Sequence, residues 1–319
     1  MREEPCPAPQ PDEVLVEATV SAISAGTEML VYRGHLPPGM PVDATIRGLG
    51  GAPSYPMKYG YASVGRVVDV GREVADDWQG RLVFSLHPHE SHYVAPTVEL
   101  MPVPAGLSAA HAALYPHAET AVTLLMDGRP MVGEDVAVFG QGVVGLMTTN
   151  FLARLPLSSL VAVDPLPLRR KRSLDMGAHR AVDPADADEL DAMAASFDLT
   201  YEVSGSPAAL DGAVAATGFR GRVVIGSWYG DRPVEVALGG TFHRSRMALI
   251  SSQVSTIDPQ WSGRWTRERR SAVAWRLLRD VDVEPLVTHR FSFADAAAAY
   301  ELVDQHPADT IQVLLDYET

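Results

Sequence analysis

The segment between residues 135 and 164 constrains the fold of this 319-residue chain more than any other. An apolar stretch, Asp135–Phe139, leads into the turn Gly140-Gln141-Gly142-Val143-Val144-Gly145, and the pattern that follows is typical of a helix over 143–155. In such a turn the first glycine permits a sharp bend, the second leaves room beside the backbone, and the third lets helix and strand approach closely. A second apolar stretch, Leu160–Asp164, follows the helix. This order predicts a strand–turn–helix–strand unit of a parallel sheet.

The same turn is suited to the phosphates of a dinucleotide. The helix that begins at Val143 and Val144 would present its positive N-terminal end to them. Asp164 ends the next strand, 164 − 145 = 19 residues after Gly145, where a carboxylate can accept hydrogen bonds from ribose hydroxyls. The alternative interpretation of Asp164 is a strand-end residue that caps the turn at Pro165.

Charge decides between the two nicotinamide dinucleotides. Asp164 would repel the 2′-phosphate of NADP, which favours NAD. The basic run from Arg169 to Arg172 could instead hold that phosphate, or it could be a solvated helix face. We therefore expect NAD as the cofactor, with NADP as the alternative.

Strand and helix patterns alternate through the second half of the chain. The expected strands are 135–139, 160–164, 197–203 and 221–226, and the expected helices are 143–155, 166–176, 207–216 and 267–279. Such alternation predicts a parallel sheet covered on both faces. The first ~115 residues contain short strand patterns at 13–20, 65–71, 81–86 and 91–95, which are typical of a small barrel or sandwich.

Composition excludes several classes of partner. The chain has 26 basic and 40 acidic residues, a net charge of −14, which argues against nucleic acid and anionic membranes. No apolar run reaches the ~18 residues of a membrane span, and the acidic start is unlike a signal peptide. The single cysteine, Cys6, excludes an intramolecular disulfide. We expect a cytoplasmic protein that acts on a small molecule.

Several segments resemble one enzyme family. Ala25–Gly34 resembles its C-G-T-D-x-x-x-Y-x-G segment, Tyr59–Val68 its G-H-E-x-x-G-x-V-V segment, Glu202–Pro207 its E-x-S-G-S strand end, and Pro285–Phe291 its I-T-H-R-F segment. Together with the glycine-rich turn, they resemble the medium-chain dehydrogenase/reductase superfamily, the alcohol-dehydrogenase-like enzymes. The resemblance covers nearly the whole chain and implies a homodimer. It implies an α/β fold: a GroES-like β-barrel catalytic domain (1–115 and 265–319) and a Rossmann domain with a doubly wound parallel sheet (116–264).

The departures from that family concern its metal. The zinc-ligand cysteine is Ala25 here, the zinc-ligand histidine is Tyr61, and the following glutamate is Ala62. Alanine has no lone pair and a neutral phenol is a poor ligand, so we expect no catalytic zinc in the usual position. Zinc-free branches include quinone and enoyl reductases, and also a group that oxidises a hydroxyethyl side chain of bacteriochlorophyllide and has similar S-x-G-T-E and G-Y-E-S-V-G segments.

The resemblance therefore implies a zinc-independent, NAD(P)-dependent oxidoreductase. We expect it to transfer a hydride between the nicotinamide and a polar alcohol or carbonyl substrate, in a biosynthetic pathway. One alternative is a reductase of an activated C=C bond, and another is a cofactor-binding protein that has lost catalysis.

Two hydroxyls are candidates for the chemistry without zinc. Thr27 matches the family position whose hydroxyl relays the substrate proton. The Tyr61 phenol should point into the space of the lost ligand, where the positive nicotinamide would favour a lowered pKa. The alternative is that Tyr61 only fills the volume of the metal.

The histidines form the second group of candidates. His87-Pro88-His89-Glu90-Ser91-His92 is expected to place His87 and His89 on one face of a strand, with His92 after a turn. These residues could bind substrate and move a proton, form a relocated metal site, or be structural. The resemblance places His117 and Glu119 beside the nicotinamide and Ser204 near the cofactor. A glutamate near the start of a helix, such as Glu119, is by default structural.

Overall fold

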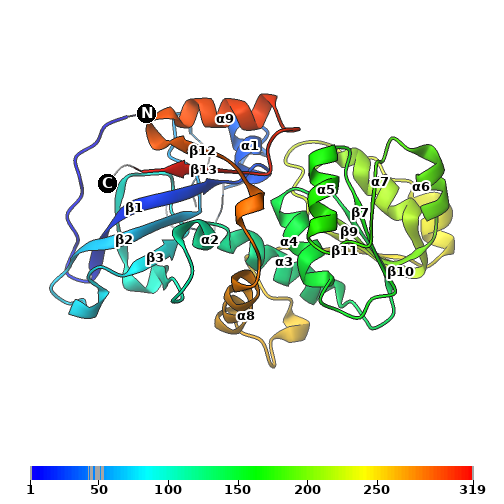
Figure 1. The fold of residues 1–319 in the computed structure, drawn as a ribbon, viewed down its shortest axis with the longest axis horizontal. Helices are drawn as coiled ribbons and strands as arrows, with labels where there is room; N and C mark the ends of the chain where they lie inside the picture. The colour runs from blue at the N-terminus through cyan, green and yellow to red at the C-terminus, as the bar shows by residue number, and fades with distance from the viewer. Residues whose placement is uncertain (1, 42, 44–45, 47–50, 52–53, 318–319) are drawn as a thin grey trace. The chain divides into compact units, whose positions relative to one another are not determined.

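The computed structural model describes residues 2–41, 43, 46, 51 and 54–317, and the chain divides into two compact units. Unit 1 comprises Met1–Pro116 and Asp282–Thr319, and unit 2 comprises His117–Val281 (Figure 1). The chain returns to unit 1 at residue 282 rather than at the expected 265. The reason is that helix α8 (Arg267–Arg279) packs within unit 2, where its buried Arg270 pairs with Glu119 at 3.1 Å.

Unit 1 is built on a seven-stranded sheet in the order β12-β13-β1-β2-β3-β5, with β4 paired to β1. Its elements are β1 (Glu13–Ile23), α1 (Thr27–Tyr32), β2 (Ser63–Val70), β3 (Leu82–Ser85), β4 (His92–Pro96), β5 (Leu100–Pro102), α2 (Ala109–Ala113), β12 (Val287–Ser292), α9 (Ala296–Gln305) and β13 (Gln312–Asp316). The strands expected in the first 115 residues correspond to β1, β2, β3 and β4. This sheet is the GroES-like part of the fold.

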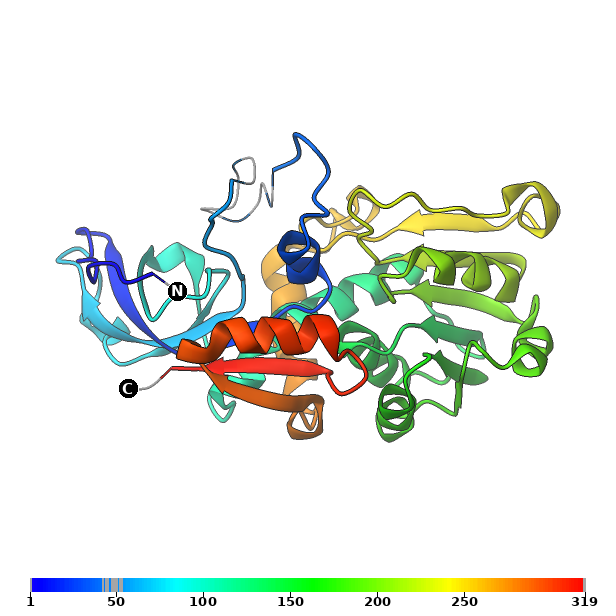
Figure 2. The same ribbon diagram turned by 90° about the horizontal axis from the view of Figure 1, so that it is seen from above.

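Strand β1 holds unit 1 together because it pairs with three strands, β2, β4 and β13, all antiparallel. Its residues alternate between buried and partly exposed from Glu13 to Val20, as expected for a half-buried strand. Beyond that point β1 is buried continuously, because α9 covers the sheet beside β13 (Figure 2). Ala299 and Val303 of α9 pack there against Ile23.

Unit 2 contains six parallel strands in the order β11-β10-β9-β6-β7-β8. Its elements are α3 (Tyr115–Gly128), β6 (Asp135–Phe139), α4 (Val143–Leu152), β7 (Ser159–Val163), α5 (Pro167–Asp175), β8 (Arg180–Val182), α6 (Ala187–Met193), β9 (Phe197–Glu202), α7 (Pro207–Ala216), β10 (Thr217–Ile225), β11 (Ala248–Ser251) and α8. The strand order reverses beside β6, which is the doubly wound arrangement expected from the sequence.

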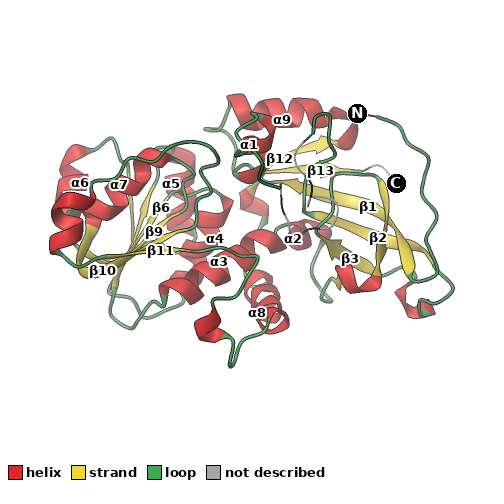
Figure 3. Cartoon of the chain, turned by 180° about the vertical axis from the view of Figure 1, so that it is seen from behind, coloured by secondary structure: helices red, strands yellow, loops and turns green. Residues whose placement is uncertain are grey.

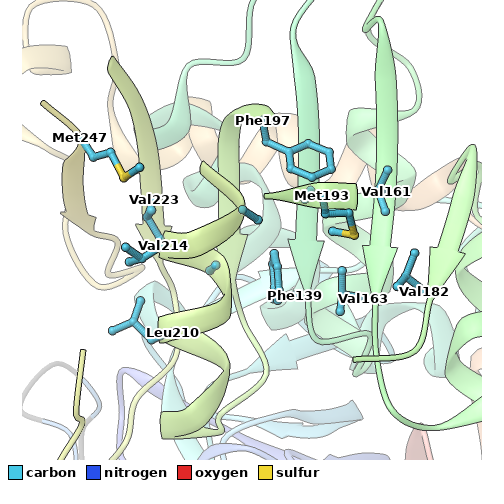
Figure 4. Close-up of a cluster of buried hydrophobic side chains, with 13 residues drawn as sticks. Phe139, Val161, Val163, Val182, Met193, Phe197, Leu210, Val214, Val223 and Met247 are labelled. Atoms are coloured by element: carbon cyan, nitrogen blue, oxygen red, sulfur yellow. The ribbon is translucent and has the colours of Figure 1, made fainter. Parts of the chain in front are cut away.

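Alternate residues of β6 show how the sheet is covered on both faces. Val136 and Val138 pack in a cluster with Leu124 of α3 and Leu152 of α4. Ala137 and Phe139 point the other way, into a cluster formed with α6 and α7 (Figure 4). The secondary-structure colouring in Figure 3 shows the helices on either side of these strands. The prediction of a Rossmann sheet is therefore confirmed.

Within the described part of the chain, none of the helices combines the length and the apolar character needed to cross a membrane.

Candidate functional site

The glycine-rich turn of unit 2 joins β6 to α4 and needs glycine for different reasons at its three positions. Gly140 has φ +94°, and a Cβ there would lie 2.5 Å from the Ser204 nitrogen. A Cβ on Gly145 would lie 1.9 Å from the Gly140 carbonyl oxygen. At Gly142, the N-cap of α4, a Cβ would meet only Nη1 of Arg169, at 3.9 Å, among the described atoms. Gly140 and Gly145 thus serve the fold, whereas Gly142 borders open space.

Asp164 connects the turn to the end of β7. It is 3% exposed, and its Oδ2 accepts a hydrogen bond from the Gln141 N–H at 2.7 Å. Its Oδ1 accepts another from the Leu166 N–H at 2.8 Å. A carboxylate has about four acceptor positions, so both oxygens can accept a further bond from a ribose hydroxyl. The structural and the cofactor-binding interpretations of Asp164 are therefore compatible.

The arginines of α5 differ in their printed partners and in how close they lie to the glycine-rich turn. Arg170 donates to the carbonyls of Asp164 and Pro165 and pairs with Asp183 at 2.9 Å. Arg172 pairs with Asp175 at 3.0 Å. Arg169, by contrast, lies against Gly142 at the mouth of the turn. Of these three arginines, Arg169 is the one that lies beside the glycine-rich turn.

The end of β9 lies beside the same turn. The Ser204 hydroxyl and N–H both donate to Oε1 of Glu202, which is fully buried. The Tyr229 hydroxyl donates to the other oxygen of that carboxylate. Glu202 and Tyr229 are site residues that the sequence analysis did not single out. Glu202 stood in a quoted motif, but nothing in the sequence linked it to Tyr229.

The residues of unit 2 fit a dinucleotide. The space beside Gly142 is open. Because glycine has no side chain to cap the helix, the first N–H groups of α4, at Val143 and Val144, have no side-chain cap from this residue. Asp164 ends the next strand and Ser204 lies beside Gly140. The structure thus brings together the glycine-rich turn, Asp164, Arg169 and Ser204, from the ends of β6, β7 and β9 and from α5.

Unit 1 places Thr27 and Tyr61 together. The Tyr61 hydroxyl donates a hydrogen bond to Oγ of Ser24 and is also hydrogen-bonded to Thr27. Burial, together with the negative charge of Glu28, raises the pKa of Tyr61 to about 12. The expectation of a lowered pKa is therefore not met in the protein chain itself, because it considered the cofactor's charge and neither the burial of the phenol nor the carboxylate of Glu28.

His89 joins the same group, but not as expected. It lies in the loop after β3, and its Nε2 is 3.1 Å from Oε2 of the fully buried Glu28. Its Nδ1 shares a 2.7 Å hydrogen bond with the hydroxyl of Ser21. His87 points elsewhere, stacking on Tyr93 and bonding to Glu90 at 2.9 Å. The expectation of two imidazoles on one face of a strand is thus wrong, because β3 ends at Ser85.

The other candidates have local partners. His92, on β4, lies 3.6 Å from a carboxylate oxygen of Glu17. His117 is buried at 4% exposure in α3, and Glu119 accepts hydrogen bonds from Arg270. The structural interpretations therefore account for the observed contacts of His92 and Glu119.

The side chains at the family's metal position do not fit zinc. Ala25 offers no donor atom, the Tyr61 oxygen is bound to Ser24, and His89 is bound on both nitrogens. Among the residues that the structure describes, no three His, Cys, Asp or Glu side chains are grouped as a metal site would require.

Comparisons with known proteins identify related dehydrogenases. A family profile described as zinc-binding dehydrogenase matches residues 143–266, a segment within unit 2 that excludes Ala25 and Tyr61. The D-guloside 3-dehydrogenase of Escherichia coli K12 is 26% identical over 269 residues, covering 81% of this chain and 77% of the enzyme. The 2-desacetyl-2-hydroxyethyl bacteriochlorophyllide A dehydrogenase of Cereibacter sphaeroides is 26% identical, covering 97% of this chain and 92% of the enzyme.

These matches support the resemblance to the medium-chain dehydrogenase/reductase superfamily. This chain is an NAD(P)-dependent oxidoreductase. An alcohol dehydrogenase from Escherichia coli CFT073, solved with NADH, has the same fold, with a TM-score of 0.75 at 18% identity. That match covers 98% of this chain and 94% of the dehydrogenase.

Proposed function

We propose that this chain is a zinc-independent dehydrogenase that transfers a hydride between a nicotinamide cofactor and a polar alcohol or carbonyl substrate of a biosynthetic pathway. The observation that carries the proposal is the Tyr61 hydroxyl. It stands at the position of a metal ligand and is held by Ser24 and Thr27, next to Ala25. The expected substrate class agrees with the alcohol and polyol dehydrogenases among the relatives.

The cofactor supplies the hydride acceptor or donor, and the residues around the glycine-rich turn would hold it. The N–H groups at the start of α4 would bind its pyrophosphate, with Arg169 as a neighbouring cation. Asp164 would accept from the ribose. NAD is favoured over NADP because Asp164 would repel a 2′-phosphate, while Arg170 and Arg172 already have carboxylate partners.

The side chains of unit 1 would hold the substrate oxygen. Tyr61, with its raised pKa, keeps its proton at neutral pH, and it would donate its hydrogen bond to the substrate oxygen in place of Ser24. Thr27 provides a second hydroxyl, and His89 contributes through Glu28. Positioned donors stabilise negative charge that develops on an oxygen during the reaction, which is the task a metal performs in zinc enzymes.

Metal analysis and a substrate panel test this proposal. Elemental analysis of the purified protein should find far less than one zinc per chain, and about one zinc per chain would contradict zinc independence. With NADH, the protein should reduce polar carbonyls rather than enones. Reduction of enones alone would favour a C=C reductase, and binding without any hydride transfer would favour an inactive cofactor-binding protein.

Cofactor preference is tested by fluorescence titration of the bound dinucleotide. We expect NADH to bind more tightly than NADPH. Arg169→Leu should weaken both, because Arg169 lies by the pyrophosphate cradle. Tighter NADPH binding, lost in Arg169→Leu, would show that Arg169 recognises the 2′-phosphate and would overturn the preference for NAD.

A further inference from the structure

Glu28 is a fully buried carboxylate in unit 1 with three hydrogen-bond donors from three different parts of the chain. The Ser24 N–H donates to Oε1 at 2.8 Å. The Tyr300 hydroxyl of α9 donates to Oε2, and Nε2 of His89 lies 3.1 Å from the same oxygen. Burial of a charged carboxylate is costly unless such partners surround it.

The network continues beyond His89 and can hold a proton without losing a hydrogen bond. Nδ1 of His89 bonds to Ser21, whose hydroxyl shares a 2.9 Å bond with that of Tyr317. When Nδ1 is unprotonated, it accepts from Ser21, which accepts from Tyr317. When Nδ1 is protonated, the two hydroxyls reverse, so every bond remains.

Tyr61 is attached to this network through Ser24. The Tyr61 hydroxyl donates to Oγ of Ser24, and the backbone of Ser24 is fixed by Glu28 at both its N–H and its carbonyl. Among the described residues, the carboxylates that act on Tyr61 are Glu28 and Asp43, and the ring of Tyr59 packs edge-on against that of Tyr61. Of the two carboxylates, Glu28 has the larger effect, and both act in the same direction by raising the pKa of Tyr61.

A purely structural role for Glu28 is the competing explanation. Its two hydrogen bonds with the backbone of Ser24 resemble those of a capped helix N-terminus, and they would fix the start of α1. A neutral glutamine of the same size would perform that task equally well. The two explanations therefore differ in whether the charge of Glu28 matters.

We propose that Glu28 is a positioning residue: it fixes the backbone of Ser24, whose hydroxyl holds the Tyr61 hydroxyl until a substrate oxygen replaces it, and its buried charge acts on Tyr61. This inference rests on the proposed function of Tyr61. It extends the site to Ser21, Ser24, Tyr300 and Tyr317, and it gives His89 the role of a protonatable partner of Glu28 rather than of a substrate ligand.

The decisive experiment follows the ionisation of Tyr61 by NMR in the full chain, labelled with ¹³C at the tyrosine ζ carbon, without cofactor or substrate. Tyr61→Phe identifies the signal. An adjacent charge shifts a titration by about one pH unit or more. We therefore expect the Tyr61 signal of Glu28→Gln to titrate at a pH at least about one unit lower than that of the native protein. Glu28→Asp, which keeps the charge, should remain close to native.

Glu17→Gln is the matched control. Glu17 is also a carboxylate beside an imidazole, 3.6 Å from Nε2 of His92, but it does not contact Tyr61. The Glu17→Gln substitution should leave the titration of Tyr61 unchanged. Circular dichroism at each pH establishes that the variants are folded. An unchanged titration in folded Glu28→Gln would overturn the inference.

Ser24→Ala provides the second test, should Glu28→Gln not fold. It removes the acceptor of the Tyr61 hydroxyl but keeps both backbone bonds to Glu28. We expect a shifted ¹³Cζ signal and faster ring flipping of Tyr61, and an unaltered signal would overturn the inference. Both tests are made without turnover, so failure of the proposed function would appear in the hydride-transfer assays and not here.

Discussion

At the scale of single residues, the Tyr61 hydroxyl is the group on which the proposed chemistry most depends. Loss of one positioned hydrogen-bond donor reduces turnover by about 10²-fold or more. We therefore expect Tyr61→Phe to lower kcat by about that factor on the best carbonyl of the panel, with the affinity for NADH unchanged. Steady-state kinetics and fluorescence titration measure the two quantities.

Tyr59→Phe is the control for that substitution. Tyr59 lies two residues away, its ring packs edge-on against that of Tyr61, and its pKa is also raised by burial. Its loss of a hydroxyl should have little effect on kcat. If Tyr61→Phe keeps most of its turnover as well, the phenol only fills the space of the absent metal ligand.

The three glycines of the turn offer a second test at this scale. Gly142→Val should abolish dinucleotide binding but leave the fold stable, because its side chain would enter open space where the pyrophosphate approaches. Gly145→Val should instead destabilise the protein, because its Cβ would collide with the Gly140 carbonyl. Thermal unfolding and NADH titration separate the two effects. Normal NADH binding by Gly142→Val would place the phosphates elsewhere.

At the scale of elements, an arginine on β10 links that strand by hydrogen bonds to the connection between α3 and β6. Arg222 donates to both oxygens of Glu134 at 2.7 Å and to the carbonyls of Gly128 and Arg129. Burial opposes the charged form of Glu134, but Arg222 and the Met131 N–H outweigh it and lower the pKa of Glu134. The charged pair therefore stabilises the folded state at neutral pH.

Glu134→Gln should reduce the free energy of unfolding at pH 7 by about 2 kcal/mol, because it breaks a charge-assisted pair that is mostly buried. A carboxyl with a lowered folded pKa stabilises the protein above its unfolded pKa, and this stabilisation is lost as pH falls through the folded pKa. The difference in the free energy of unfolding between the variant and the native protein should therefore become smaller below about pH 4. Urea unfolding at several pH values measures it.

The exposed pair Arg72–Glu73 provides the comparison for that prediction. Its charges lie 3.6 Å apart with side chains 81% and 61% exposed, so Glu73→Gln should change stability by less than about 0.5 kcal/mol. A pH-independent effect of Glu134→Gln would show that packing, rather than charge, is lost.

At the scale of the whole molecule, the outer edge of the parallel sheet bears on assembly. The strand expected at 221–226 lies inside the sheet as β10, and β11, which follows it, is one of the two edge strands of the described sheet. Exposed edge strands tend to be covered by pairing. We propose that β11 pairs with its copy in a homodimer, as the family resemblance implies.

Light scattering at micromolar concentration should therefore give a mass near twice 34.4 kDa. Because charged edge residues oppose strand pairing, Ala248→Lys together with Ser251→Lys should shift the protein toward the monomer, since both positions are exposed. Gln79→Lys together with Gln10→Lys, which add the same charge in unit 1, should not. A monomeric native protein would contradict the proposed dimer.

The sequence by itself determined the parallel sheet and its cofactor turn, because these depend on local patterns. The alternation of strand and helix from 135 onward and the spacing from Gly140 to Asp164 are contiguous signals, and the structure places their side chains as expected. The prediction that no zinc binds in the family's position likewise came from the sequence alone, because it depends on the identities of Ala25 and Tyr61 and not on geometry.

Only the tertiary structure decided which polar groups surround Tyr61. Glu28 meets Tyr300 across 272 positions, and Ser21 meets Tyr317 across 296. Those contacts exist because β1 pairs with β13 and α9 packs on the same sheet, which no local pattern specifies. The direction of His89 likewise depends on where β3 ends. The raised pKa of Tyr61 depends first on the burial of its phenol and then on the carboxylate of Glu28, both of which the fold brings about. Residue identity set which groups were available, and long-range packing set which of them interact.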